Sequence, residues 1–158
     1  MPKTFEGAHD ATSLRIAIVA SRFNEEIVEN LLVGALDCLE KHGAKDVAVF
    51  RVPGAFEIPG LARMLIGRGG FDALVTIGCL LRGETPHFDF ISNQVTMELS
   101  RVAVDTCFPV TFGVITCDTL EQAVARSSKG SGNKGWEAAL AAIEMANLWR
   151  QIRTELKS

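Results

Sequence analysis

The sequence lacks an apolar run long enough to cross a bilayer, and its opening segment, MPKTFEGAHDATS, has no apolar signal-peptide core. Also missing are a C-x-x-C pair and any other cysteine spacing typical of zinc sites. Three of the four cysteines lie in apolar stretches, which favours buried thiols in a cytoplasmic protein over disulfides. The cysteines are Cys38, Cys79, Cys107 and Cys117.

An excess of positive charge is absent too. Sixteen Lys and Arg residues against 19 Asp and Glu give a formal net charge of −3, and the positive residues are scattered. Neither nucleic acid nor a membrane surface is therefore an expected partner. With 158 residues, 47% of them hydrophobic and 22% charged, the chain suits one globular domain over residues 1–158. We expect residues 1–12 to form an extended N-terminal arm.

Four short β-rich runs divide the chain, at 14–20, 47–52, 73–78 and 110–115. Each is followed by a segment with helical spacing of its apolar residues, and these segments are 27–43, 57–67, 91–104 and 120–127, with a further long helix at about 133–156. Nearly continuous apolar strands joined by crossover helices are typical of a parallel sheet covered on both faces. The pattern predicts a single three-layer α/β domain without internal repeats or linkers.

Ligands of open parallel sheets bind beyond the carboxyl ends of the strands, so the loops after the strands are the first places to search. Phe23 follows the first strand, where it either stacks on a planar ligand or folds back onto the core, and the residues alone leave both open. Glu57 follows the second strand. Its carboxylate either accepts hydrogen bonds from ligand hydroxyls or interacts with a helix dipole in the first turn, and the second interpretation is favoured.

The segment after the third strand, residues 79–90, holds the main candidate for proton transfer. Of the three histidines only His87 follows a turn at the ligand edge of the sheet, and imidazole titrates near neutrality. Asp89 is not expected to orient it, because side chains two residues apart diverge on a helix. Cys79 is the nearest candidate nucleophile, but burial at a strand end is the favoured interpretation.

The segment Gly130–Gly135 reads GSGNKG, which matches the dinucleotide-binding pattern G-x-G-x-x-G. That pattern has its meaning only between a strand and a helix, whereas here it follows a predicted helix, so the dinucleotide interpretation is excluded. No P-loop motif is present either. Arg126, Lys129 and Lys134 surround these glycines and suit an anionic ligand, but an ordinary helix–helix connection with solvated lysines is the alternative.

Five separated motifs, in register along nearly the whole chain, resemble the 6,7-dimethyl-8-ribityllumazine synthase family. They are Arg22-Phe23-Asn24, VPGAFEIP at 52–59, RGETPHFD at 82–89, PVTFG at 109–113, and GNKG at 132–135 with IEMANL at 143–148. The resemblance implies a flavodoxin-like αβα sandwich that uses no metal or organic cofactor. It also implies condensation of 5-amino-6-(D-ribitylamino)uracil with L-3,4-dihydroxy-2-butanone 4-phosphate, with release of phosphate and water.

The resemblance assigns roles to single residues as well. Phe23 would stack on the pyrimidine ring, His87 would transfer protons, and Glu57 would bond the ribityl hydroxyls. The ring and ribityl chain would be held by Asn24, Ala55, Phe56, Glu57, Cys79, Leu80 and Leu81. Glu84 and Thr85 would meet the butanone phosphate through backbone N–H groups and the Thr85 hydroxyl. A neighbouring subunit would supply Phe112, Arg126 and Lys134, with Arg126 gripping the phosphate.

Members of the family form pentamers, and some pack twelve pentamers into an icosahedral shell. The short link over residues 126–133 favours the shell. Two positions depart from the family pattern: Glu84 stands where a small residue is common, which leaves the role of its side chain open, and Trp136 is expected to fill a subunit interface. The rival functions are a flavin- or lumazine-binding protein, a shell-forming protein and an archaeal-type riboflavin synthase.

Overall fold

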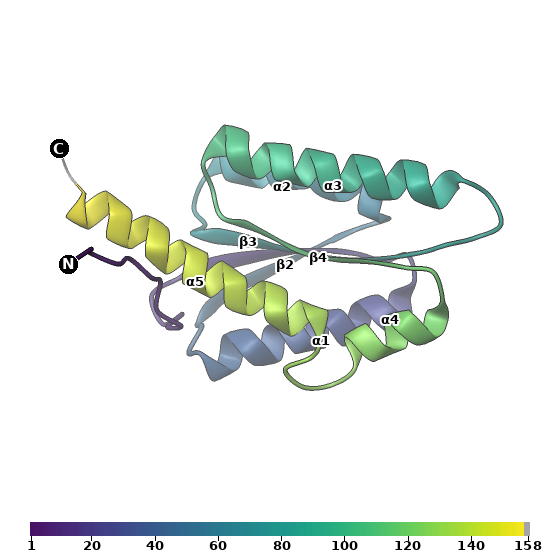
Figure 1. Ribbon diagram of the computed structural model, residues 1–158, viewed down its shortest axis with the longest axis horizontal. Coiled ribbons are helices and arrows are strands. Elements are labelled where there is room, and N and C mark those ends of the chain that lie inside the picture. Colours follow the sequence, from purple (N-terminus) through teal and green to yellow (C-terminus); the bar gives the residue numbers. More distant parts are fainter. Residues whose placement is uncertain (157–158) are drawn as a thin grey trace.

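The computed structural model, which describes residues 1–156, contains a four-stranded parallel sheet between two layers of helices (Figure 1). The strands are β1 (Arg15–Ser21), β2 (Asp46–Val52), β3 (Ala73–Leu81) and β4 (Val110–Cys117), and their order in the sheet is β2-β1-β3-β4. All three pairings are parallel. The predicted three-layer fold is therefore confirmed. The last two residues of the predicted 1–158 domain lie outside the described residues.

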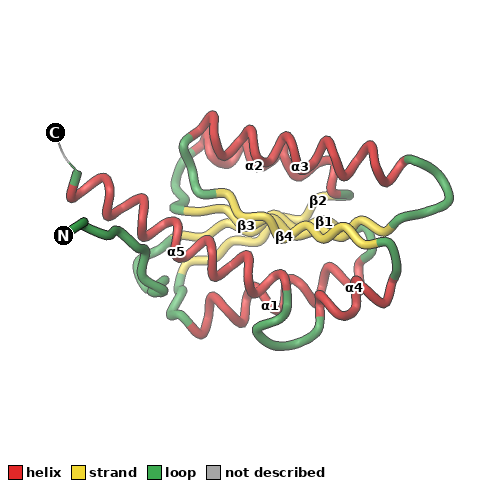
Figure 2. The backbone as a smooth tube through the Cα atoms, in the orientation of Figure 1, coloured by secondary structure: helices red, strands yellow, loops and turns green. Residues whose placement is uncertain are grey.

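The helices divide between the two faces of the sheet (Figure 2). One face is covered by α1 (Glu25–Lys41), α4 (Leu120–Ser127) and α5 (Lys134–Glu155), and the other by α2 (Ile58–Arg68) and α3 (His87–Thr106). Two separate clusters of buried apolar side chains result, one on each face. Because β1 and β3 are central and covered on both sides, their sequences are nearly continuous apolar runs.

Several element ends differ from the sequence-based expectation. β3 continues three residues beyond the predicted end at 78, as far as Leu81, and α3 begins at His87 instead of residue 91. His87 consequently stands in the first turn of a helix. The apolar stripe that marks α3 begins only further along, because the side chains of the first turn are mostly exposed. A one-turn 3-10 helix, Ala55–Glu57, also precedes α2.

The N-terminal segment, residues 1–12, contains no helix or strand and runs beside α5 (Figure 1). The Asn147 side chain donates hydrogen bonds to the carbonyl oxygens of Ala8 and Asp10, at 2.7 and 2.9 Å. The Lys3 ammonium pairs with Glu155 at 3.1 Å. Within residues 1–156, none of the helices has the length and apolar character that crossing a membrane requires.

Candidate active site

A cavity of about 450 Å³ opens where β1, β2 and β3 end and α3 begins. Its lining comes from the loop after β1, the 3-10 turn after β2, the last residues of β3 and the first turns of α3. This is the edge of the sheet at which open parallel folds bind ligands. The cavity therefore lies where the sequence predicts a site.

Most of the residues predicted to bind substrate or to transfer protons line this one cavity. They are Phe23, Asn24, Ala55, Phe56, Glu57, Cys79, Leu80, Leu81, Thr85 and His87. Sequence reasoning did not select Phe88 and Ile91, which also line it. Phe88 belongs to the first turn of α3, which the predicted helix 91–104 does not include, whereas Ile91 is the first residue of that predicted helix. Glu84 lies in the same loop as Thr85 and is exposed, but it does not line the cavity.

Two aromatic side chains stand exposed at the cavity. Phe23 is 69% exposed and Phe56 is 66% exposed, although both are large and apolar. Phe23 is held by its backbone, whose N–H donates to the Pro53 carbonyl at 3.1 Å. The alternative in which Phe23 folds back onto the core is therefore wrong. A planar ligand can stack on a ring presented in this way.

Asn24 joins the loop after β1 to the end of β3. Its side-chain nitrogen donates to the Cys79 carbonyl at 2.8 Å. Its backbone adopts the left-handed conformation, with φ 59° and ψ 51°, at the N-cap of α1. Asparagine tolerates this conformation better than most residues do. The bond fixes the backbone of the β3 end, which forms one side of the cavity.

Glu57 acts within its own turn and also faces the cavity. One carboxylate oxygen accepts a hydrogen bond from the Gly54 backbone N–H at 2.9 Å, which closes the 3-10 turn over Ala55–Glu57. The helix predicted from residue 57 begins at Ile58 instead, so Glu57 lies in the turn before α2, where its carboxylate acts through this hydrogen bond. An ionised carboxylate can accept several hydrogen bonds, so this contact leaves capacity for a ligand hydroxyl.

Three of the four cysteines are buried, structural thiols. All four are free, and Cys38, Cys79 and Cys117 are buried while Cys107 is exposed. Burial raises the pKa of the Cys79 thiol to about 12, and the neighbouring Cys117 adds to the effect. A thiol is a poor nucleophile when it stays protonated. The interpretation of Cys79 as a buried residue is confirmed over that of a nucleophile.

Sequence reasoning missed Arg82, which connects three parts of the site. Its Nε donates to Asp118 just beyond β4 at 2.7 Å, and its Nη1 donates to both carboxylate oxygens of Asp89 at 3.1 Å. Its guanidinium carbon lies 4.5 Å from the centre of the Phe88 ring. The sequence did contain a signal, because an arginine directly follows a buried strand and precedes the loop with His87.

The predicted basic cluster does not join this cavity within the chain. Arg126 is exposed, with its Nη1 donating to the Gln122 carbonyl at 3.1 Å, and Lys134 pairs with Glu137 at 2.8 Å. Phe112 is 48% exposed and lines a separate hollow beside α3. All three predicted contributions from a neighbouring subunit thus lie on the surface of the chain, outside its own cavity.

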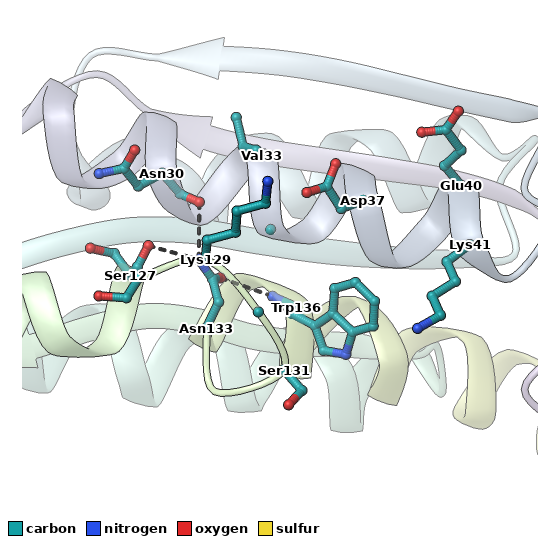
Figure 3. Close-up of a pocket in the computed structure, with 13 residues that line it drawn as sticks. Asn30, Val33, Asp37, Glu40, Lys41, Ser127, Lys129, Ser131, Asn133 and Trp136 are labelled. Atoms are coloured by element: carbon teal, nitrogen blue, oxygen red, sulfur yellow. Dashed lines mark hydrogen bonds between the residues drawn. The ribbon is translucent and has the colours of Figure 1, made fainter.

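The glycine-rich segment forms the start of α5 and borders a larger hollow of about 970 Å³ against α1 (Figure 3). Asn133 caps the helix, since its Oδ1 accepts from the Gly135 and Trp136 backbone N–H groups at 2.8 and 3.1 Å. Its Nδ2 donates to carbonyl oxygens of Asn30 and Ser127, at 3.0 and 2.9 Å. The segment follows α4, so the structure confirms that it is no dinucleotide fingerprint.

Trp136 lies on the wall of the larger hollow and contacts α1 of its own chain (Figure 3). Its ring centre is 6.2 Å from that of His42, and the Lys41 ammonium lies 5.5 Å above it. Lys129 extends from the loop toward α1 in the same view. The hollow contains neither His87 nor the exposed phenylalanines, so the smaller cavity is the better candidate for chemistry.

Comparison with known proteins identifies the family. A family model described as 6,7-dimethyl-8-ribityllumazine synthase matches residues 13–150. A protein of that name from Aquifex aeolicus (strain VF5) is 50% identical over 151 residues, which cover 94% of this chain and 98% of the relative. A second, from Prosthecochloris aestuarii (strain DSM 271 / SK 413), is 47% identical over 152 residues, covering 95% and 98%. A third, from Chlorobium phaeobacteroides (strain BS1), is 46% identical over 152 residues, which cover 95% of this chain and 98% of the relative.

Proposed function

Because the chain belongs to the 6,7-dimethyl-8-ribityllumazine synthase family, we propose that it makes this lumazine in riboflavin biosynthesis. The substrates are 5-amino-6-(D-ribitylamino)uracil and L-3,4-dihydroxy-2-butanone 4-phosphate, and phosphate and water are released. One observation supports the proposal above all others. Segments far apart in sequence bring stacking rings, hydrogen-bonding groups and a histidine to a single cavity of about 450 Å³.

The uracil substrate occupies the part of the cavity formed by β1, β2 and β3. Phe23 stacks on its ring, and the backbone of Cys79–Leu81 meets the ring and the ribityl chain. Glu57 accepts hydrogen bonds from ribityl hydroxyls. Asn24 acts by fixing the Cys79 carbonyl, which supports a preformed binding surface. Ala55 and Phe56 complete this half of the site.

The butanone phosphate lies toward Thr85 and Glu84, with the phosphate near their backbone N–H groups and the Thr85 hydroxyl. A phosphate calls for positive charge, yet no Lys or Arg is among the residues from 1–156 that line the cavity. This supports a site completed by Phe112, Arg126 and Lys134 of a neighbouring subunit. The enzyme then works as a homo-oligomer, either a pentamer or an icosahedral 60-mer, in the cytoplasm.

The reaction joins an amine to a ketone, loses water and phosphate, and closes a ring. These steps need proton transfer and a clamp for the leaving anion, and they need no strong protein nucleophile. His87 transfers protons at the reacting atoms. Much of the acceleration comes from holding the two substrates together, since well-oriented reactants reach effective molarities of about 10⁵ M or more.

The decisive experiment incubates the purified protein with both substrates and follows lumazine absorbance. We expect turnover, a reduced but measurable kcat for His87→Ala, and unchanged kcat for His9→Ala, whose imidazole lies in the N-terminal arm near Glu144. Arg126→Ala should raise the KM for the butanone phosphate or lower kcat/KM more severely. Absence of lumazine would favour a flavin- or lumazine-binding protein or a shell-forming protein. Consumption of added lumazine to give riboflavin would favour a riboflavin synthase.

A further inference from the structure

The structure assigns Arg82 a role as a positioning residue that fixes the first turn of α3, and with it His87, against the cavity. The inference rests on the proposed function, because it takes His87 as the residue that transfers protons. Arg82 follows the last residue of β3, and His87 is the first residue of α3. Between them lies a connection of exposed residues.

The backbone gives this connection few anchors. Arg82 N–H donates to the Cys117 carbonyl at 2.9 Å, which secures the beginning of the segment to β4. At its other end, the Asp89 N–H donates to the Pro86 carbonyl at 3.0 Å, a contact within the first turn of α3 itself. A Cβ placed on Gly83 would have no heavy atom within 4 Å. Backbone contacts alone therefore do little to fix the path of residues 83–86 between β3 and α3.

The Arg82 side chain supplies the missing anchor. Its planar fork binds Asp118 next to β4 and Asp89 in α3, so it bridges the sheet to the helix that begins with His87. The same guanidinium lies over the Phe88 ring, which lines the cavity. Arg82 thus contacts the two residues that directly follow His87. Moving this fork would move the imidazole relative to the bound substrates.

Arg82 is poorly suited to be the phosphate clamp itself. Two carboxylates, Asp89 and Asp118, already bind its donors, and together they outweigh its single positive charge. These hydrogen bonds raise the pKa of the guanidinium further above its ordinary range. Exposed ion pairs also add little to global stability. Loss of Arg82 should therefore change the alignment of reacting groups more than it changes folding or phosphate affinity.

The test compares Arg82→Gln with Arg15→Gln in the complete enzyme. Arg15 is a matched control, because it also pairs with an exposed aspartate, Asp46, at 2.6 Å and also lies over a phenylalanine ring, but it stands at the first residue of β1, away from the cavity. We expect Arg82→Gln to lower kcat about 10- to 100-fold, as small misplacements of catalytic groups do. The KM for each substrate should change less than about threefold, because the contacts that bind the substrates before the reaction are unchanged. Arg15→Gln should match the wild type, and neither variant should shift the thermal midpoint.

Two further variants separate positioning from other roles. Arg82→Lys keeps the charge and one ion pair, so it should recover part of the lost kcat. Asp118→Asn should lower kcat on its own, and the Arg82→Gln/Asp118→Asn double variant should lose no more than Arg82→Gln, because both remove the same contact. Three results would each overturn the inference. They are multiplicative losses of kcat in the double variant, equal kcat for Arg82→Gln and Arg15→Gln, and a raised KM for the butanone phosphate alone. An inactive wild type would instead refute the proposed function.

Discussion

At the scale of single residues, the left-handed backbone of Asn24 has a cost that its side chain offsets. The conformation is unfavourable for most L-residues by roughly 1–2 kcal/mol, and the Asn24 amide compensates by bonding the Cys79 carbonyl. Glycine can adopt the same φ without strain but cannot form the bond. Alanine can do neither, so the two substitutions separate the backbone contribution from the hydrogen bond.

We predict that Asn24→Gly lowers the free energy of unfolding by about 1 kcal/mol, for the lost hydrogen bond, and that Asn24→Ala lowers it by about 2 kcal/mol. Chemical denaturation at matched protein concentration measures both. Equal losses would show that the left-handed conformation costs nothing here. In both variants the KM for the uracil substrate should rise, because the β3 end that Asn24 holds is part of its proposed site.

The thiols give a second prediction at the residue scale. Burial raises the pKa of Cys38 to about 11 and that of Cys79 to about 12, and it raises the pKa of Cys117 as well. A raised thiol pKa means that the protonated form persists at pH 8, and only the thiolate attacks disulfide reagents. At pH 8, an aromatic disulfide reagent should therefore react with one thiol of the native protein, that of exposed Cys107, and release one equivalent of aromatic thiolate.

Guanidinium-denatured protein should release four equivalents of aromatic thiolate, one for each cysteine of the chain. Cys107→Ser should abolish the fast reaction of the native protein and leave enzyme activity unchanged, since Cys107 lies between α3 and β4 and does not line the cavity. A second fast thiol in the native protein would contradict the burial of the other three.

At the scale of elements, the close contact between α1 and α5 depends on Gly135. A Cβ placed there would lie 1.9 Å from the Leu31 carbonyl oxygen, which is backbone and cannot rotate away. Within a helix alanine is intrinsically better than glycine, so any loss on Gly135→Ala must come from this contact. We predict destabilisation of about 2–3 kcal/mol, as for other overpacked sites.

Gly132→Ala is the matched control for that substitution. It lies in the same GSGNKG segment, yet a Cβ at Gly132 would meet nothing within 4 Å. Its unfolding free energy should stay within about 0.5 kcal/mol of the wild type. If both variants unfold at the same denaturant concentration, the close approach of α1 and α5 does not restrict this position.

Whether a segment is a helix or a strand was predictable from the sequence where burial sets the spacing of its apolar residues. The residues at which helices and strands begin and end were harder to predict. The continuous apolar runs at β1 and β3 were recognisable because both faces of these strands are covered. The start of α3 was not, because His87 and its neighbours face a cavity and solvent instead of the core. The cavity itself followed from topology, which brings the strand ends together. The ion pairs of Arg82 depend on side-chain geometry that no local pattern encodes.

At the scale of the whole molecule, α3 presents an apolar stripe to solvent. Phe90, Met97 and Val104 are spaced seven residues apart, which places them on one face of the helix, and they are 68%, 56% and 72% exposed. Contiguous exposed apolar surface is a mark of sites that bind other proteins. The exposed apolar face of α3 is a reason to expect self-association. It is independent of the proposal that a neighbouring subunit completes the site.

We predict that Met97→Glu lowers the mass of the assembly, measured by light scattering at fixed protein concentration. A carboxylate at the centre of the stripe would have to lose its hydration on contact with another subunit, at a cost that apolar packing does not repay. In a free chain the same position is open to water, so far-UV circular dichroism should stay unchanged. Met97→Leu, which keeps an apolar side chain of similar volume, should keep the wild-type mass. If Met97→Glu assembles like the wild type, the stripe lies outside the subunit contacts, and self-association must use other surfaces such as those around Phe112 and Arg126.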